Sequence, residues 1–258
     1  MLETILKPIA EDLETTNNLL KNEFTYITKR TGNISGVEHL LIKTSLRPAL
    51  VILSSRIFGG NPEKTAVLAV VFQFLYFSSK VHDLFTNEEP LPGIKGSGQM
   101  SGDRFYILLG DYFHSRASVI LQGSGIRGMT TSLTDIVCQM QEARIQKRVM
   151  PGYNTIAQTS HTIIRKESAE LLAGCCALGA RLAGASADEQ ENMASYGRNL
   201  GMALKLSKEN DSLEEAAHYL DKAREALFKI PAQPERAVLE QLIKMVTDSG
   251  IKAQRLVG

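Results

Sequence analysis

Apolar residues recur every three or four positions along most of the chain. The repeat passes through Ile9, Leu13, Leu20, Phe24 and Ile27 near the N-terminus and through Leu133, Ile136, Val137 and Met140 in the middle. Residues at these intervals share one face of an α-helix, whereas strands alternate with a period of two. No segment combines sustained alternation with hairpin turns. The pattern predicts an all-α bundle of roughly ten helices.

Local signals indicate where some helices begin and end. Ser212 and Glu215 have the spacing of a capping box, in which each residue satisfies a backbone N–H of the other at the first turn of a helix. Glycine-rich stretches at 91–102 and 122–128 lie between helical patterns and are expected to be loops. Since no internal repeat and no long linker divides the chain, residues 1–258 are expected to form a single domain.

The most apolar segment runs from Ala66 to Phe77, where Gln73 is the only polar residue. A membrane-spanning helix needs about 20 apolar residues, so this shorter run predicts a buried core helix and no transmembrane segment. The first sixteen residues carry acids where a secretory signal has its apolar region. We therefore expect a cytoplasmic protein.

The overall charge excludes one class of partner. Twenty-nine Lys and Arg residues are balanced by 28 Asp and Glu residues, giving a net charge of +1, so no strong field attracts nucleic acid. The three cysteines, Cys138, Cys175 and Cys176, have no zinc-like spacing, and two of them are neighbours that point apart on a helix. We expect all three to be reduced packing residues.

The apolar helix ends in an isolated carboxylate. Asp83 is followed by Leu84, which cannot bind a metal ion, and one helical turn later by Asn87, which offers only a neutral oxygen. Carboxylates one turn apart on a helix can reach magnesium ions, which prefer oxygen ligands and often bridge to phosphate groups. The segment has the outline of a metal site from which ligands are missing.

Five segments, in this order, resemble the trans polyprenyl diphosphate synthase family. They are LRPAL at 46–50, VHDLFTN at 81–87, LLGDYFHSRA at 108–117, ESAELLAGCCALGARLAGA at 167–185 and YGRNLGMALKL at 196–206. The resemblance implies an isoprenoid-synthase-like helical bundle. In that family, magnesium held by two DDxxD motifs on facing helices ionises an allylic diphosphate, which then condenses with isopentenyl diphosphate.

The resemblance also implies that both metal motifs are degenerate here. The first falls on DLFTN at 83–87 and the second on KENDS at 208–212, and each window carries one net negative charge where the family has three carboxylates. A magnesium cluster would bind poorly to so little opposing charge. The degenerate metal and diphosphate positions are Asp83, Leu84, Asn87, Lys208, Glu209 and Ser212.

Other departures concern the cations that hold diphosphate in the family. Arg47 is retained, and we expect it either to contact diphosphate or to pair with an acid such as Glu38. Glu167 stands where the family has a lysine, and Lys205 where it has a glutamine. The resemblance implies that these positions share one pocket with the metal motifs, so the losses are interpreted as one lost function.

The leading hypothesis is a non-catalytic subunit of a heteromeric polyprenyl diphosphate synthase, which supports the activity and product chain length of its partner. No catalytic residue, metal or cofactor is expected in this subunit, because the partner with intact DDxxD motifs would hold the magnesium. By resemblance, the subunit contact is expected at Phe74, Phe77, Tyr112 and Phe113. Without the partner, the chain would form a homodimer.

Two alternatives stay open. One is a divergent isoprenoid transferase or lyase that uses Asp83, Glu209 and Asp211 with fewer metal ions. The other is a homodimeric protein that binds a prenyl lipid without chemistry. Two further carboxylates, Asp111 and Glu142, are expected to connect helices through hydrogen bonds rather than to act as acids or bases.

Overall fold

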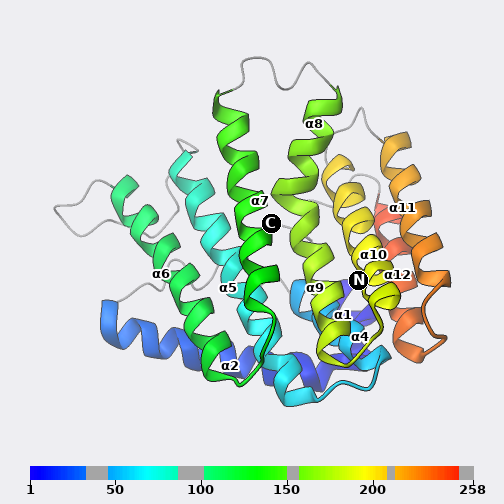
Figure 1. Cartoon of the computed structure of the whole chain (residues 1–258), viewed down its shortest axis with the longest axis horizontal. Helices are drawn as coiled ribbons and strands as arrows, with labels where there is room; N and C mark the ends of the chain where they lie inside the picture. Colours follow the sequence, from blue (N-terminus) through cyan, green and yellow to red (C-terminus); the bar gives the residue numbers. More distant parts are fainter. Residues whose placement is uncertain (33–45, 87–101, 150–156, 208–212, 250–258) are drawn as a thin grey trace.

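The fold is helical, as the spacing of the apolar residues predicts. The computed structural model describes residues 1–32, 46–86, 102–149, 157–207 and 213–249, and these contain no strand. At the helix ends 83–86, 102–104 and 157–159, and at residue 249, it describes the backbone alone. Figure 1 shows most helices running up and down, with α2 crossing beneath them.

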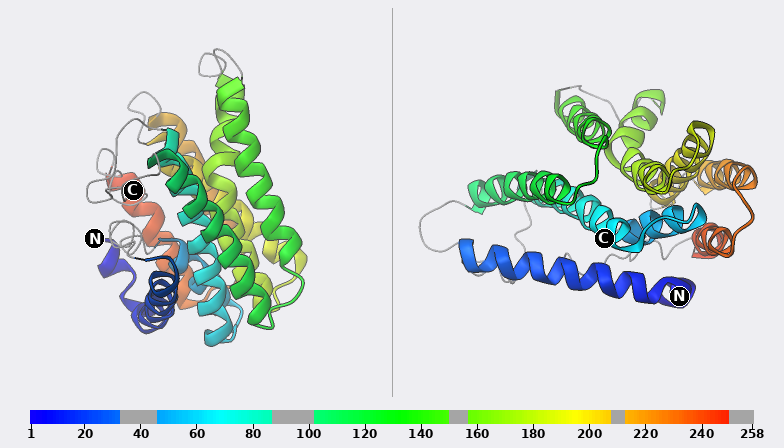
Figure 2. Two further views of the ribbon diagram at one scale, coloured as in Figure 1. Left: turned by 90° about the vertical axis from the view of Figure 1, so that its left-hand side faces the viewer. Right: turned by 60° about the horizontal axis from the view of Figure 1, so that its bottom comes forward.

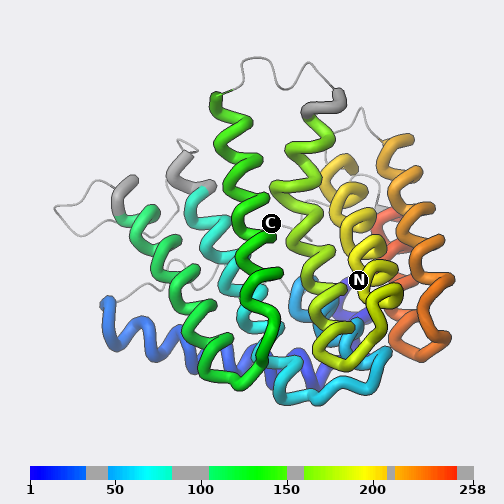
Figure 3. The backbone as a smooth tube through the Cα atoms, in the orientation of Figure 1, coloured from blue at the N-terminus to red at the C-terminus, as the bar shows by residue number. Residues whose placement is uncertain are grey.

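The elements follow one another without a long described loop. They are α1 (Leu2–Ile5), the 3-10 turn η1 (Lys7–Ile9), α2 (Ala10–Thr31), α4 (Leu46–Ile57), α5 (Pro62–Thr86), α6 (Gly102–Gly123), α7 (Thr130–Val149), α8 (Ala157–Ile164), the π-helical turn η3 (Arg165–Ala169), α9 (Glu170–Leu182), α10 (Ala187–Leu206), α11 (Leu213–Phe228) and α12 (Pro234–Ser249). The tube in Figure 3 shows that α8, η3 and α9 form one nearly continuous rod.

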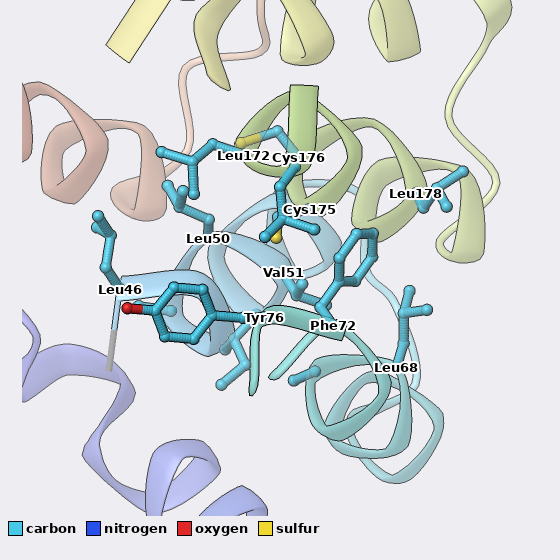
Figure 4. Close-up of a cluster of buried hydrophobic side chains, with 14 of the residues drawn as sticks. Leu46, Leu50, Val51, Leu68, Phe72, Tyr76, Leu172, Cys175, Cys176 and Leu178 are labelled. Atoms are coloured by element: carbon cyan, nitrogen blue, oxygen red, sulfur yellow. The ribbon is translucent and has the colours of Figure 1, made fainter. Parts of the chain in front are cut away.

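Helix α5 occupies the centre of the bundle. It packs against α2, α4, α6 and α9, and Figure 4 shows its Phe72 and Tyr76 among side chains of α4 and α9. By length and composition its residues 62–82 could cross a membrane, but 83% of this window is buried inside the structure. Burial on this scale is typical of a core helix in a globular fold.

The predicted subunit contact is wrong for three of its four aromatic residues. Phe74, Phe77 and Phe113 are fully buried and cluster around Phe24 of α2, with ring centroids 5.7 to 6.0 Å from that ring. Helix α2, which lies as a separate layer in the second view of Figure 2, therefore covers this face within the chain itself. Only Tyr112 is partly exposed.

Two predicted connections between helices are confirmed. Asp111 of α6 lies 3.3 Å from His82 of α5, and a Cβ at the neighbouring Gly110 would come within 2.6 Å of the same imidazole ring. Glu142 of α7 accepts a hydrogen bond of 2.7 Å from Lys166 of η3. Both carboxylates therefore join elements of the bundle.

Helices α9 and α10 approach closely because α10 has glycines at the positions that meet the backbone of η3 and α9. A Cβ at Gly197 would lie 2.4 Å from the carbonyl oxygen of Leu172, and one at Gly201 would lie 2.7 Å from the Cα of Ala169. Helix α10 begins with a capping box, in which Ser186 accepts from the Glu189 N–H and Glu189 accepts from the Ser186 N–H. The sequence prediction had missed this cap.

The cysteines divide into two kinds. Cys175 and Cys176 are buried as expected, whereas Cys138 is exposed on α7, so the packing prediction is wrong for that residue. Burial raises the pKa of the Cys175 thiol well above its usual value and that of Cys176 to about 12. Both buried thiols therefore stay protonated near neutral pH.

Replacing Gly197 by alanine should destabilise the protein. The new methyl group would meet the α9 backbone, and overpacking of this kind costs about 1–3 kcal/mol in the free energy of unfolding, measurable by urea denaturation. Gly123→Ala is the matched control, because nothing lies within 4 Å of its Cβ position. Equal stability of the two variants would contradict the close approach of α9 and α10.

Thiol titration should distinguish the cysteines. In native protein at pH 8, an aromatic disulfide reagent should modify Cys138 rapidly and the buried pair only on unfolding, because the reactive species is an accessible thiolate. Rapid native modification of all three thiols would contradict the burial of α9. The Cys138→Ser variant should show almost no fast reaction.

Candidate functional site

A small pocket lies within the bundle, near the C-terminal ends of α5 and α10. Its volume is about 100 Å³, and it is bordered by α4, α5, α7, η3, α9 and α10. The lining residues are Arg47, Tyr76, Ser79, Lys80, Met140, Arg144, Glu167, Ser168, Leu171, Leu172, Gly201, Leu204 and Lys205. Residues far apart in the sequence therefore meet in one cavity.

Arg47 is the most deeply buried charge in this pocket. Its residue is 4% exposed, and the guanidinium carbon lies 3.2 Å from the centroid of the Tyr76 ring. Burial lowers the pKa of the guanidinium from its usual value, and Tyr76 partly opposes that shift. Nε and Nη1 have no hydrogen-bond partner in the described part of the chain.

This environment leaves the guanidinium incompletely compensated. A desolvated cation over an aromatic ring gains about 2 kcal/mol, whereas the effective penalty for burying an ion is several kcal/mol. Natural proteins usually pair buried charges with an opposite charge or a ligand. Arg47 borders the pocket, and its Nε and Nη1 atoms are buried without a hydrogen-bond partner among the described residues.

A second arginine is fixed by the wall of the pocket. Nη2 of Arg144, on α7, donates to the Ser79 carbonyl oxygen at 2.7 Å and to the Ser79 hydroxyl at 2.6 Å. These bonds tie α7 to α5 at the level of the cavity. They hold the Arg144 guanidinium at the edge of the pocket.

Two half-buried lysines complete the cationic lining. Lys80 lies on α5, three residues before Asp83, and Lys205 lies in the last turn of α10, three residues before Lys208. The ammonium group of Lys80 is 5.7 Å from the centroid of the Tyr76 ring, which Arg47 also contacts. The two helices thus place a cation three residues before the window 83–87 and three residues before the window 208–212.

The single carboxylate among the described lining residues already has a partner. Glu167 sits in the π turn η3, and its carboxylate is 3.6 Å from Lys147 of α7. Single π turns inside a helix often occur at functional sites, because the extra residue redirects side chains. Here the turn directs Glu167 and Ser168 toward the cavity, against the closely packed Gly201 of α10.

The described part of the pocket lining is mainly cationic. Four cations, Arg47, Lys80, Arg144 and Lys205, surround the cavity against the one carboxylate of Glu167. Magnesium requires oxygen ligands with negative charge, and nearby cations oppose its binding. The described residues also contain no group of three or more His, Cys, Asp or Glu side chains placed to bind a metal ion.

The sequence-predicted positions fall into two groups. The structure brings Arg47, Glu167 and Lys205 together, as the resemblance implied. Asp83 and Leu84 lie in the last turn of α5, but their side chains are outside the described set. The remaining degenerate positions, Asn87, Lys208, Glu209 and Ser212, lie outside the described residues, as do Asp211 and Glu38.

Two pocket residues were missed by the sequence prediction. Lys80 is a charged residue directly after a nearly unbroken apolar run, and this contrast was the available signal. Arg144 gave no local signal, because its position beside Ser79 depends on how α7 packs against α5.

Comparison with known proteins agrees with this architecture. The chain is 22% identical to the octaprenyl diphosphate synthase of Escherichia coli (strain K12) over 163 residues, which is 62% of this chain and 50% of that enzyme. The match therefore spans about half the length of that relative.

Solved structures share the fold. The polyprenyl synthase of Caulobacter crescentus CB15, solved with calcium and isoprenyl diphosphate, superposes with a TM-score of 0.83 at 18% identity, covering 96% of this chain and 97% of that one. The geranyl diphosphate synthase small subunit of Antirrhinum majus gives a TM-score of 0.69 at 15% identity, covering 95% and 99%. The polyprenyl synthetase family model matches residues 43–208, and the chain therefore belongs to that family.

Proposed function

We propose that this chain is a non-catalytic subunit of a heteromeric polyprenyl diphosphate synthase. In this role it binds a catalytic partner with intact DDxxD motifs and influences the activity and product chain length of that partner. The observation that carries the proposal is the charge of the pocket, where cations outnumber the one described carboxylate. The degenerate windows at 83–87 and 208–212 agree with it.

The fold comparison is compatible with such a role. One of the structures that share the fold is described as the small subunit of a geranyl diphosphate synthase. That likeness supports the fold alone, and the functional argument depends on the residues of the pocket. Glu167 reverses the charge of the lysine that the family resemblance implies at its position, and Lys205 adds a positive charge where the family has a neutral glutamine.

A divergent enzyme is the second candidate. Arg47 borders the pocket and has two nitrogen atoms without a hydrogen-bond partner among the described residues, which favours retained contact with diphosphate. Asp83 keeps one carboxylate of the first motif. The prenyl-lipid-binding alternative receives no such support. Ligand pockets for drug-sized molecules are about 300–1,000 Å³, and the volume of this pocket is about 100 Å³.

The partner surface that we propose is the outer side of α6 and α7. These helices border a groove with Val71 and Leu75 of α5 at its base. Elsewhere on the same two helices, large apolar residues face solvent, with Leu108 59% exposed, Val119 55% exposed and Ile145 61% exposed. Such an apolar surface is suited to burial against another subunit.

The purified chain alone should not condense isopentenyl diphosphate with an allylic diphosphate in the presence of magnesium. Radiolabelled product, separated by chain length, is the measurement. Restoring the first motif with Leu84→Asp and Asn87→Asp should not produce activity, because Lys80 and Lys205 still oppose metal binding in the described pocket. Turnover by the unmodified chain would favour the divergent enzyme instead.

Charge placed on the outer face of α6 should weaken assembly. Burying Leu108 and Val119 contributes about 1.5–3 kcal/mol each by area, so Leu108→Glu with Val119→Glu should lower affinity for the catalytic partner well beyond about tenfold. The partner, purified with this chain from native cells, is titrated and complex formation is followed by sedimentation, with product chain length measured in parallel.

The control for this assembly test is Leu213→Glu, which changes an exposed leucine on α11, away from the groove. It should assemble as the unmodified chain does. If both variants assemble normally, the contact does not use α6. If the unmodified chain neither binds a DDxxD-bearing protein nor changes its products, the subunit proposal is wrong.

A further inference from the structure

We infer that a second pocket, bordered by α8, η3, α10 and α11, binds a small organic monoanion that carries one carboxylate group on a single ring. Its volume is about 200 Å³, and its described lining shares no residue with the first pocket. The π turn η3 contributes Glu167 to the first pocket and Arg165 to the second. Figure 1 shows α8, α10 and α11 on one side of the bundle. The inference goes beyond the proposed subunit role and does not depend on it.

The apolar part of this pocket belongs to a small cluster that is separate from the main core. The cluster consists of Ile164, Ala169, Met202, Leu206 and Ala216, with Tyr219 packed against it. Met202 and Tyr219 also line the pocket. The imidazole of His161, another lining residue, stands edge-on to the Tyr219 ring, with the two centroids 6.4 Å apart. A thioether beside aromatic rings is a suitable contact surface for a planar ring.

Two arginines determine the charge of the pocket. Arg198 of α10 donates to both carboxylate oxygens of the buried Glu170, at 3.0 and 3.3 Å, so this pair is neutral. Arg165 lies 3.8 Å from the same carboxylate, which is beyond hydrogen-bond distance, and its side chain is 48% exposed. One positive charge therefore remains beside the cavity, and the described lining contains no carboxylate.

Two carboxylates outside the described lining limit the charge of the ligand. Glu191 lies 3.6 Å from Arg198 and is 73% exposed, and Glu215 lies 3.0 Å from His161 and is 50% exposed. Water and salt screen both groups, but they repel a dianion more strongly than a monoanion. The guanidinium fork of Arg165 matches the two oxygens of one carboxylate. A carboxylate therefore fits this site better than a phosphate ester or a diphosphate.

The size of the pocket limits the rest of the ligand. Pockets for drug-sized molecules are about 300–1,000 Å³, and this pocket is smaller, at about 200 Å³. It is therefore suited to about one ring beside the carboxylate, with the ring against Met202 and Tyr219 and the carboxylate at Arg165.

The test is an NMR titration of the full chain labelled with ¹³C in its methionine methyl groups. Met202 lines the second pocket and Met140 lines the first, so one spectrum reports on both. Benzoate, in a buffer without other carboxylates or phosphate, should shift the Met202 resonance saturably, with a Kd on the order of 1 mM or lower. The Met140 resonance should not move. Met202→Leu and Met140→Leu identify the two resonances.

Related probes separate the contributions of charge and ring. Benzamide has the same ring without the charge, and acetate has the charge without the ring, so each should bind at least about tenfold more weakly than benzoate. Phenyl phosphate and inorganic diphosphate should bind no more tightly than benzoate. Tighter binding of either phosphate compound at Met202 would overturn the assignment to a carboxylate.

Arg165→Met should lower the affinity for benzoate about tenfold or more, because it removes a charge-assisted contact. Arg224→Met on α11 is the matched control, since it makes the same charge change at a side chain of similar exposure, 41%, that does not line the described pocket. It should bind as the unmodified chain does. Tyr219→Phe keeps the ring and should retain the affinity within about threefold, whereas Tyr219→Leu should lower it.

Three results would each overturn the inference. They are the absence of a saturable Met202 shift up to about 20 mM benzoate, equal affinities for benzoate and benzamide, and equal effects of Arg165→Met and Arg224→Met. The comparison of benzoate with benzamide uses the unmodified chain, so it decides the question even if a variant fails to fold. None of these measurements involves the catalytic partner, so their failure and failure of the subunit proposal are distinguishable.

Discussion

The bundle depends on the burial of α5. This helix is apolar on almost every side, so water must be excluded by other elements around its whole circumference. Helices α2, α4, α6 and α9 supply that cover. Near the C-terminal end of α5, Ser79 and Lys80 follow the apolar residues and border the pocket. The position of the site thus follows from where the apolar run stops.

At that end, the chemistry of the pocket is determined by its charges rather than by its shape. Arg47 and Arg144 are held by Tyr76 and Ser79, neither of which carries negative charge. The result is a small cationic cavity within a fold that the solved polyprenyl synthases share. This retained scaffold with a mainly cationic described lining is compatible with the proposed subunit role.

Sequence periodicity predicted the interior well. All five residues of the first apolar series are buried, as are those from Val238 to Val246 that share its spacing. Periodicity was less informative where a helix end is exposed, as at Leu213, or where a small residue such as Cys138 faces solvent. The all-α fold could therefore be predicted from the chain alone, with errors confined to single positions.

The site was less predictable, for a physical reason. Apolar spacing shows that a helix face is buried but not what covers it, and Phe24 of α2 takes the place that had been assigned to a second subunit. The family resemblance predicted that Arg47, Glu167 and Lys205 share one pocket. It could do so because the order of the motifs along the chain indicates which segments meet in the folded protein. Arg144 reaches the pocket only through the packing of α7 on α5, which no local pattern encodes.

The most direct test of the account of the cationic pocket is a crystal structure of the chain with manganese and a non-hydrolysable allylic diphosphate analogue. Anomalous scattering would locate any manganese ion. The account predicts diphosphate density against Arg47, Lys80 and Lys205, with no anomalous peak between α5 and α10. A manganese ion bridging the diphosphate to Asp83 and to the residues after α10 would contradict it.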